Sequence, residues 1–387
     1  MSDHPSLSAR RVLSNDEIQR YSRHLLLPEI GVDGQRKLKE ARVVCVGAGG
    51  LGSAVSMYLA AAGVGTLGLV EFDVVDVSNL QRQVLYTGAD AGRPKIEAAA
   101  TRLAAMNAGI RIEPHAAALS AANAPGILGR YDIVVDATDN FPARYLINDA
   151  CVLLGKLDVS GSVFRFEGQV SVYASKQGPC CRCLHPEPPP PGLVPGCGEA
   201  GVLGVLPGII GTIQAAEAIK LVTGVGEPLA GRLLVFDALT MRFREVRIAK
   251  DPACPVCGTH PTIRELVDGE QYCGTAPIVL PPELEISAAD LKARLDRGDA
   301  LVLVDVREPQ ESTINGIQGS IVVPLGDLPA GIARLDRRSD IVVYCKAGVR
   351  SASAVQALQA AGFSRVVHLS GGIQSWIETI DPAQPRY

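Results

Sequence analysis

A glycine-rich turn at residues 47–52 (GAGGLG) constrains the fold of this chain most strongly. The apolar segment 41–46 before it predicts a buried strand, and the segment 51–62 after it predicts a helix. Glycines between a strand and a helix let the backbone approach phosphate oxygens at the positive end of the helix. Further apolar and helical segments alternate along the next 85 or so residues. This βαβ rhythm predicts a Rossmann-like, doubly wound parallel sheet with helices on both faces, with strands at 67–72 and 132–137 and a helix at 95–106.

Bulk composition limits the class of protein. A chain of 387 residues predicts two or three domains, and 47% hydrophobic with 20% charged residues is ordinary for a globular protein. The net charge of −4 offers no basic face for nucleic acid and no polybasic patch for a membrane. No apolar run is long enough to span a bilayer, and the first residues do not resemble a signal peptide. We therefore expect a cytoplasmic protein with neither nucleic acid nor membrane as a partner.

The order of patterns along the chain predicts four parts. Ser14-Asn15-Asp16-Glu17 resembles a helix start within a polar N-terminal segment. A proline- and threonine-containing stretch before residue 285 resembles an interdomain linker, after which a second, smaller α/β rhythm begins. That second rhythm has strands at 301–306 and 341–344 and helices at 288–297 and 351–361. The predicted parts are a helical arm at 1–40, a nucleotide-binding domain at 41–275, a linker at 276–285 and a second α/β domain at 286–387.

The glycine turn alone leaves several readings open. Glu71 and Asp73 stand at the end of the second predicted strand, where a carboxylate can bind ribose hydroxyls. Taken with the glycines only, the obvious interpretation is an NAD-dependent dehydrogenase, and the main alternative is a tight turn without a ligand. Further residues change this balance.

Polar and cationic residues follow the later strands at the sheet edge where α/β proteins bind ligands. Arg82 and Lys95 can neutralise a triphosphate, and Asp139 can hold Mg²⁺. Each residue alone resembles a solvated loop charge, but together around one glycine turn they indicate ATP rather than a hydride-transfer cofactor. The predicted ATP-binding residues are Gly47, Gly49, Gly50, Glu71, Asp73, Ser78, Asn79, Arg82, Gln83, Lys95, Asp139 and Asn140.

Several of these motifs together resemble the ubiquitin-activating-like adenylyltransferases, in particular the activators of sulfur-carrier proteins typified by MoeB and ThiF. The resemblance covers roughly residues 14–275 and implies ATP binding with Mg²⁺ on Asp139. It also implies a homodimer in which Arg23 reaches the neighbouring subunit's site. Relatives usually have Asp where this chain has Glu71, which retains the carboxylate. The matching motifs are Arg20-Tyr21-Ser22-Arg23, the glycine turn, Ser78-Asn79-Leu80-Gln81-Arg82-Gln83, Thr138-Asp139-Asn140 and Phe166-Glu167-Gly168-Gln169.

Two pairs of cysteines have the spacing of zinc knuckles. Cys180-x-x-Cys183 and Cys254-x-x-Cys257 together supply four thiolates for a tetrahedral Zn²⁺ site. Four protein ligands leave no position for water, so the predicted role is structural; the alternative is a set of buried thiols. Cys181 has the wrong spacing, Cys45 and Cys151 have core-like surroundings, and Cys273 has no predicted role.

Cys197 lies between glycines in the long loop that follows a run of prolines. That setting predicts an exposed cysteine, and a loop cysteine without a role is the alternative. The family resemblance implies that the matching cysteine lies above the adenylate and forms a covalent link to the carrier protein. We carry this role to Cys197 as an expectation.

A second reactive cysteine, Cys345, starts the turn between the predicted strand 341–344 and an alanine-rich helix. Backbone N–H groups of such a turn, the helix dipole and the charge of Arg350 favour a thiolate, and they can stabilise a persulfide. Residues from about 284 to 387 resemble a rhodanese domain, in which the seven-residue turn fits a sulfurtransferase better than a phosphatase. Asp305 and Arg307 are expected to support the fold or the turn, or to form a surface ion pair.

These motifs together predict a two-step enzyme. The C-terminal Gly-Gly carboxylate of a ubiquitin-like sulfur-carrier protein is adenylylated by ATP, and the Cys345 persulfide then converts it to a thiocarboxylate. A cysteine desulfurase or thiosulfate is the expected upstream sulfur donor. The predicted catalytic residues are Cys345, Cys197, Asp139, Arg82, Arg23 and Arg350. Alternatives are an activating enzyme for protein conjugation with a regulatory rhodanese domain, and a scaffold without catalysis.

Overall fold

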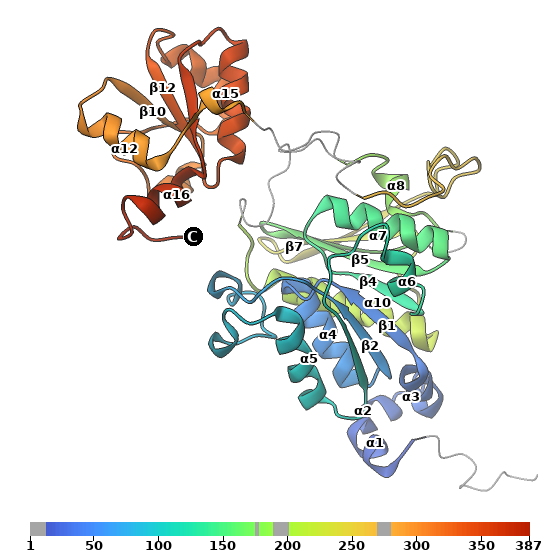
Figure 1. The fold of residues 1–387 in the computed structure, drawn as a ribbon. Helices are drawn as coiled ribbons and strands as arrows, with labels where there is room; N and C mark the ends of the chain where they lie inside the picture. The colour runs from blue at the N-terminus through green and yellow to red at the C-terminus, as the bar shows by residue number, and fades with distance from the viewer. Residues whose placement is uncertain (1–12, 175–177, 189–200, 269–279) are drawn as a thin grey trace, which may run out of the picture. The chain divides into compact units, whose positions relative to one another are not determined.

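The computed structural model describes residues 13–174, 178–188, 201–268 and 280–387 (Figure 1). The chain divides into two compact units, Met1–Gly274 and Thr275–Tyr387, each of which has its own sheet. Cys197 and Cys273 lie outside the described residues. In the part of the chain that the structure describes, no helix is long and apolar enough to cross a membrane.

The first unit begins with three helices, α1 (Asn15–Arg20), α2 (Ser22–Leu25) and α3 (Gly31–Glu40). The predicted helix start is confirmed, because the Ser14 hydroxyl accepts from the Glu17 amide while the Glu17 carboxylate accepts from the Ser14 amide. This reciprocal cap satisfies two amides that the first turn would otherwise leave without partners. The segment ahead of the sheet is therefore helical, as its sequence predicts.

The sheet of the first unit has eight strands in the order β3-β2-β1-β4-β5-β6-β7-β8. The first five positions pair in parallel, and β5 to β8 pair antiparallel. The predicted parallel sheet is confirmed, and the antiparallel extension is an addition that the sequence analysis did not identify. The strands are β1 (Arg42–Val46), β2 (Thr66–Val70), β3 (Arg111–His115), β4 (Ile133–Asp136), β5 (Leu157–Phe164), β6 (Glu167–Tyr173), β7 (Arg232–Asp237) and β8 (Arg242–Arg247).

Helices cover both faces of this sheet, and the alternation along β1 shows how. Val43 and Cys45 belong to one buried cluster, whereas Val44 and Val46 belong to another, because successive side chains of a strand point to opposite faces. The first cluster also contains residues of α4 (Gly50–Ala62), α5 (Lys95–Met106) and α10 (Leu206–Thr223). The second contains residues of α6 (Ala124–Leu128) and α7 (Phe141–Leu154). The doubly wound arrangement is thus confirmed (Figure 1).

The second unit has a smaller parallel sheet with the order β11-β10-β12-β13-β9. Its two buried clusters again lie on opposite sides of the central strand, one around Val343 and the other around Val342. The predicted smaller α/β domain is confirmed. Its elements are β9 (Glu285–Ile286), α12 (Ala288–Asp296), β10 (Leu301–Asp305), α13 (Pro309–Ser312), β11 (Ile321–Val322), α14 (Leu328–Gly331), β12 (Asp340–Tyr344), α15 (Val349–Ala360), β13 (Val366–Leu369) and α16 (Gly372–Thr379).

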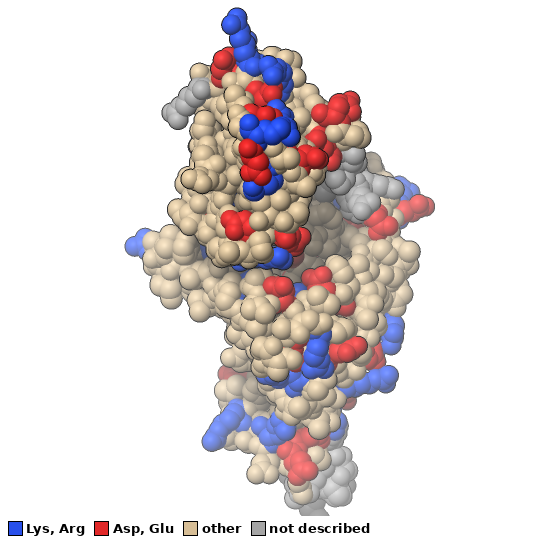
Figure 2. All heavy atoms as spheres, turned by 60° about the vertical axis from the view of Figure 1, so that its left-hand side comes forward, with Lys and Arg blue, Asp and Glu red and all other residues tan. Residues whose placement is uncertain are grey.

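Acidic and basic side chains are interspersed on the molecular face in Figure 2. This face carries no broad patch of one sign, in keeping with the small net charge of −4.

The side chain of Arg307 is one of the largest fully buried groups of the second unit. Its guanidinium contacts both carboxylate oxygens of Asp305, with Nη2 to Oδ2 at 2.6 Å, and donates to Asn315 Oδ1 at 2.8 Å. The alternative of a surface ion pair is therefore wrong, and the pair supports the core. A buried charge is tolerated only where its partners and hydrogen bonds are in place.

Replacing Arg307 by leucine leaves the buried Asp305 carboxylate without its cation. We expect the Arg307→Leu variant to lose about 3 kcal/mol of unfolding free energy in the second unit. Urea unfolding followed by tryptophan fluorescence reports on this unit, because Trp376, the single tryptophan of the chain, is buried in its core. The control is Arg365→Leu at an exposed pair with Asp340, where a loss below about 1 kcal/mol is expected. Equal losses in the two variants would contradict the role of burial.

Candidate functional site

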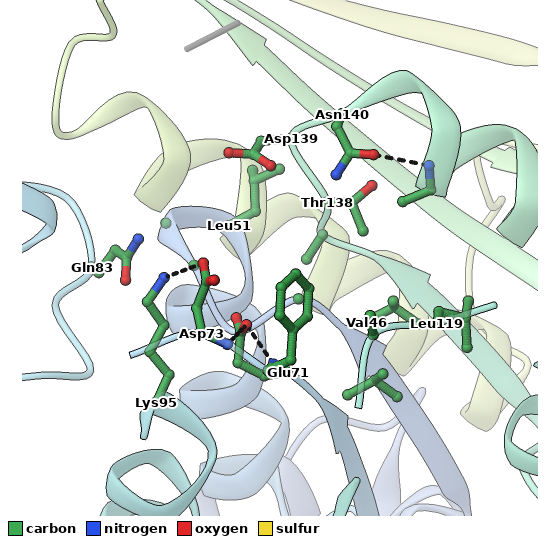
Figure 3. A pocket seen from close by; sticks show the side chains of 18 of the residues that line it. Val46, Leu51, Glu71, Asp73, Gln83, Lys95, Leu119, Thr138, Asp139 and Asn140 are labelled. Atoms are coloured by element: carbon green, nitrogen blue, oxygen red, sulfur yellow. Dashed lines mark hydrogen bonds and ion pairs between the residues drawn. The ribbon is translucent and has the colours of Figure 1, made fainter. Parts of the chain in front are cut away.

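A cavity of about 540 Å³ opens at the carboxyl ends of β1, β2 and β4, where parallel sheets bind ligands (Figure 3). Part of its wall is charged or polar and part is apolar. The polar part includes Glu71, Asp73, Arg82, Gln83, Lys95, Thr138, Asp139, Asn140 and Asp268. The apolar part includes Val46, Val70, Phe72, Leu119, Leu146 and Val163. Such a wall suits a ligand with a charged end and a flat apolar end.

The glycine turn forms the floor of the charged end, because Gly47, Gly49 and Gly50 line the cavity. Gly47 has φ +92°, a conformation that residues with a Cβ rarely adopt. A Cβ at position 52 would lie 2.0 Å from the Gly47 carbonyl oxygen, so any other residue there would force the backbone of the turn to shift. Helix α4 begins at Gly50 and its cap residue is Gly49, so the cap has no side chain to cover the helix terminus. The backbone therefore presents the positive helix end to the cavity.

Glu71 fixes the shape of this turn. Its Oε2 accepts from the Ala48 amide at 3.0 Å, and its Oε1 accepts from the amides of Phe72 and Asp73 at 2.8 and 3.0 Å. The carboxylate is buried and faces the cavity (Figure 3). These bonds tie the loop after β1 to the loop after β2. The sequence predicted Glu71 only as a ligand-binding residue and did not indicate that it anchors the backbone.

A buried lysine supplies positive charge at the start of α5. The side chain of Lys95 is 6% exposed and that of Asp73 is 56% exposed, and the two form an ion pair with 3.2 Å between Nζ and Oδ2 (Figure 3). An ammonium group has three donors, so Lys95 can keep this bond and donate to a bound anion. Asp73 thereby orients Lys95 toward the cavity.

Arg82 and Gln83 reach the cavity from the loop after η2 (Val77–Asn79). Arg82 donates to the Ser78 carbonyl at 3.1 Å, which holds its guanidinium beside the glycine turn. Gln83 is buried, and its Oε1 has no hydrogen-bond partner among the described residues. An unsatisfied buried oxygen in a cavity wall is an acceptor for a ligand hydroxyl.

Three of the residues predicted for the nucleotide site, Ser78, Asn79 and Arg23, do not line this cavity. Ser78 donates its hydroxyl hydrogen to Asp76 at 2.5 Å, and Asn79 donates to Ser78 Oγ at 3.3 Å, so both shape the η2 turn. Arg23 is exposed on α2 and is absent from the cavity wall of its own chain. The structure brings together the other predicted ATP-binding residues.

The loop after β4 contributes Thr138, Asp139 and Asn140 to the wall (Figure 3). Asp139 is exposed to the cavity, so its carboxylate is available to a cation. Asn140 caps α7, since its Oδ1 accepts from the Ala143 amide at 2.9 Å. Asn140 therefore holds the helix start, a role that its position before a helix could have indicated.

Asp136, which the sequence analysis missed, supports this loop from below. It is fully buried and accepts from the Thr138 amide and hydroxyl at 3.0 and 2.6 Å. Arg144 lies 3.4 Å from Asp136 Oδ2 and donates to the Gly161 carbonyl. Asp136 and its hydrogen bonds therefore fix the loop that carries the exposed Asp139. The position of Asp136 at the end of a predicted buried strand could have indicated this role.

The four cysteines of the two predicted pairs come together in the first unit. All four Sγ atoms lie within 4.8 Å of one another, with Cys180 and Cys254 at 3.6 Å and Cys183 and Cys257 at 3.4 Å. A tetrahedral zinc with Zn–S bonds of about 2.3 Å requires sulfurs about 3.8 Å apart, so this donor set fits the ion.

The remaining described cysteines of this unit lie outside that group. Cys181 packs with Tyr173 and Ile248, and burial raises its pKa to about 12. Cys45 and Cys151 are fully buried in the core, as predicted. These three thiols therefore serve packing.

In the second unit, Cys345 stands at the end of β12 and starts the turn to α15. The amides of Gly348 and Ser351 donate to its Sγ at 3.2 and 3.4 Å, and Sγ lies 3.5 Å from Ser351 Oγ. Gly348 has φ +100°, which turns its amide inward. The predicted turn, with backbone N–H groups facing the sulfur, is thus present. It is built to hold negative charge on sulfur.

Arg350 lies in the first turn of α15, and the expectation that its charge favours a thiolate on Cys345 stays a prediction. Its guanidinium forms a two-bonded ion pair with Glu311 at 2.7 and 2.8 Å. Burial raises the pKa of the Glu311 carboxyl, but hydrogen bonds from Arg350, the Glu308 amide and Tyr387 outweigh it and lower that pKa to about 2. The two-bonded pair fixes the orientation of the guanidinium.

Known proteins share both units. Residues 21–256 match the model of the ThiF family, and residues 287–379 match that of the rhodanese-like domain. A probable adenylyltransferase/sulfurtransferase MoeZ of Mycobacterium tuberculosis is 48% identical over 99% of this chain and 98% of its own length. The adenylyltransferase and sulfurtransferase MOCS3 of Sus scrofa is 42% identical over 98% of this chain and 90% of its own length.

Two further matches concern the first unit. A sulfur carrier protein adenylyltransferase of Thermus thermophilus is 55% identical over 67% of this chain and 98% of its own length. Among solved structures, E. coli MccB with MccA-N7isoASN aligns with a TM-score of 0.56 and 24% identity. That alignment covers 64% of this chain and 76% of MccB, and it supports the fold.

The low pKa of Glu311 predicts an acid-sensitive second unit. The folded pKa of about 2 lies below the ordinary 4.5, so the carboxylate contributes stability above pH 4.5 that is lost as pH falls toward 2. We expect this contribution to be on the order of 2 kcal/mol. Urea unfolding of wild type and Glu311→Gln, followed by Trp376 fluorescence from pH 6 to about 3, measures it. Parallel pH profiles for the two proteins would contradict the assignment.

Proposed function

Since this chain belongs to the ThiF family and carries a rhodanese-like domain, we propose that it adenylylates a ubiquitin-like sulfur-carrier protein and then thiolates it. The substrate group is the carrier's C-terminal Gly-Gly carboxylate, and the product is a thiocarboxylate. One observation carries the proposal: a single chain holds both a cavity at a glycine turn, with Arg82 and Lys95 in its wall, and a cysteine in a turn of inward amides. Relatives named for both activities match it over nearly its full length.

In the first step the carrier carboxylate attacks the α-phosphate of ATP. The carboxylate oxygen bonds to phosphorus, and pyrophosphate leaves with the bonding electrons. Lys95, Arg82 and the N-terminus of α4 stabilise the negative charge that develops on the phosphates. Glu71 holds the turn, and Gln83 Oε1 is the proposed acceptor for a ribose hydroxyl.

The first step also calls for Mg²⁺, and the exposed Asp139 is the proposed ligand, with the buried Asp136 fixing its loop. Mg²⁺ neutralises phosphate charge in such reactions. A homodimer in which Arg23 completes the neighbouring site accounts for its exposure on α2. We also propose a cytoplasmic location. The proposed division of the chain is a helical arm at 1–40, a nucleotide-binding domain at 41–275, a linker at 276–285 and a rhodanese domain at 286–387.

In the second step the terminal sulfur of a Cys345 persulfide attacks the acyl carbon, and AMP leaves. The product is an acyl disulfide on Cys345. A second thiolate then attacks the Cys345 sulfur, which releases the thiocarboxylate and leaves a disulfide that a cellular thiol reduces. Cys197 is the proposed resolving thiol, and a cysteine desulfurase or thiosulfate is the proposed source of the persulfide sulfur.

The four-cysteine group is proposed to bind structural Zn²⁺. It joins α8 (Cys181–Leu184) to the segment around Cys254 and Cys257, and its four protein ligands leave no place for a substrate. Bound zinc would draw the four thiols together as thiolates and fix the connection between the two segments.

The two activities separate by mutation. We expect Asp139→Ala to lower ATP–pyrophosphate exchange with a Gly-Gly carrier at least about 100-fold, because the metal ligand is lost. Cys345→Ala should exchange pyrophosphate at the wild-type rate but form no thiocarboxylate, which mass spectrometry of the carrier detects. The matched control is Glu97→Gln, an exposed carboxylate on α5 outside the cavity, with wild-type exchange.

Two results would contradict this division of labour. Exchange at the wild-type rate in Asp139→Ala would remove Asp139 from the site. Wild-type thiocarboxylate formation in Cys345→Ala, with thiosulfate as the sulfur source, would assign the second step to another group.

Zinc content and stability should vary together. We expect about one zinc per chain by metal analysis and loss of the metal in a Cys254→Ser/Cys257→Ser double variant. That variant should melt at a lower temperature, because the two segments lose their shared link. The control is Cys181→Ala, which lies beside the group and should keep the zinc. A zinc-free wild-type preparation of full thermal stability would rule out the structural metal.

A further inference from the structure

A buried histidine lies against the Cys345 turn. His368 is the only histidine in the sequence of the second unit, and it stands on β13 with 7% of its surface exposed. A Cβ added to Gly348 in the turn would lie 3.8 Å from its Cε1, so the ring packs directly against the turn. The proposed two-step reaction assigns this side chain no part.

Ser351 connects this histidine to the reactive sulfur. Ser351 is fully buried in the first turn of α15, and its Oγ lies 3.5 Å from Cys345 Sγ and 3.3 Å from His368 Nδ1. The same Oγ lies 2.9 Å from the Gly348 carbonyl oxygen. A hydroxyl group has one hydrogen that rotates, so it can accept from one neighbour while it donates to another. Ser351 can therefore pass a proton between Cys345 and His368.

A carboxylate faces the other nitrogen of the ring. Glu285 is the register partner of His368 between β9 and β13, and its Oε1 lies 3.6 Å from His368 Nε2. The Ser370 hydroxyl donates to Glu285 Oε2 at 2.7 Å, which leaves Oε1 for the ring. The bond from Ser370 and the charge of His368 outweigh burial and hold the pKa of Glu285 below its ordinary value. An ionised Glu285 favours the positively charged form of the imidazole.

Cys345 needs an acceptor for its proton inside the unit. The residue is 1% exposed, so its thiol has little contact with water. The amides of Gly348 and Ser351 stabilise a thiolate once it has formed, but an N–H group donates and cannot take up the thiol proton. An imidazole can take it up, and His368 is one hydroxyl group away.

We propose that His368 is a positioning residue for Cys345, which acts through Ser351 as the buried acceptor of the thiol proton. Glu285 stabilises the imidazolium that results. For its purpose this inference rests on the sulfur transfer of the proposed function, because an attacking or persulfide-forming cysteine has to be a thiolate. It names the group that makes the thiolate available within the fold.

The step is a proton relay without a change of oxidation state. The S–H bond of Cys345 breaks, the sulfur keeps the electron pair, and the proton bonds to Ser351 Oγ. At the same time the original hydroxyl hydrogen of Ser351 moves to His368 Nδ1. Ser351 ends as it began, and the products are a thiolate and an imidazolium. The new hydroxyl hydrogen of Ser351 can then rotate toward the thiolate and join the two amides as a third donor.

The hydrogen bonds and the ion pair bring two titratable groups to the histidine ring. These are Glu285 from β9 and, across Ser351, Cys345 from the end of β12. Lys346 and Arg350 belong to the same turn. Both are retained in every variant of the test, so their charges act on the sulfur equally in each.

The test is the pH dependence of Cys345 alkylation by iodoacetamide in the full chain, followed by mass spectrometry of the peptide that contains this cysteine. Only the thiolate reacts at an appreciable rate. We expect His368→Gln to move the midpoint of the pH profile upward by about one unit, because the nearby positive charge is lost. Alkylation on the acid side should then be about tenfold slower, while the rate on the alkaline plateau matches wild type.

A second variant tests the route through the hydroxyl group. Ser351→Ala should move the midpoint in the same direction, and the double variant Ser351→Ala/His368→Gln should move it no further, because His368 acts only through Ser351. The matched control is Ser353→Ala on the same helix, whose hydroxyl bonds to the Val349 carbonyl and which should keep the wild-type midpoint.

Two outcomes would overturn the inference. A wild-type midpoint in His368→Gln would show that the histidine does not take up the thiol proton. An equal loss of alkylation rate at every pH, together with a lower melting temperature by Trp376 fluorescence, would assign His368 to fold support alone. Alkylation requires no sulfur transfer, so a wild-type chain that forms no thiocarboxylate would overturn the proposed function while the midpoint still decides the role of His368.

Discussion

Hydrogen bonds from backbone amides to buried carboxylates determine the geometry of the nucleotide cavity. Glu71 and Asp136 stand at the ends of β2 and β4, and each accepts amide hydrogens from the loop that follows its own strand. Glu71 also accepts from Ala48 in the glycine turn. Because charged acceptors form strong hydrogen bonds in a buried setting, they hold these loops in one conformation. The groups that face the cavity, Lys95 and Asp139 among them, depend on this frame.

The turn at Cys345 in the second unit is built from the same order of elements as the glycine turn of the first unit. A strand ends at Cys345, a turn follows with a glycine at positive φ, and a helix begins, so that two amides point at one sulfur. The first unit places a glycine turn and the start of α4 in the same order after β1. Both turns present backbone amide donors to negative charge. They differ in size, since one faces a cavity of about 540 Å³ and the other encloses a single buried sulfur atom.

The sequence predicted the parts of the fold and site that depend on local pattern. Strand–turn–helix order placed the glycine turn, Lys95, Asp139 and Cys345 correctly in relation to their elements. The sequence did not indicate which side chains from distant segments would pair. Arg350 pairs with Glu311, 39 positions away, and Tyr387 bonds to Arg307 across 80 positions. The antiparallel strands β6 to β8 were also missed. The direction of a strand depends on which neighbour it meets, and alternation of side chains carries no such information.

Cys180 and Cys254 are separated by 74 positions, yet their sulfurs lie 3.6 Å apart. The intervening chain includes β7, β8 and the long helix α10. Contact between these sulfurs therefore closes a loop of about a quarter of the residues of the first unit. Because the entropic cost of closing a loop rises with its length, the four sulfurs are brought together at least cost once the intervening elements have packed. On a ribosome the second pair of thiols emerges after the whole sheet has been synthesised, so the four sulfurs come together only when every strand of the unit is available.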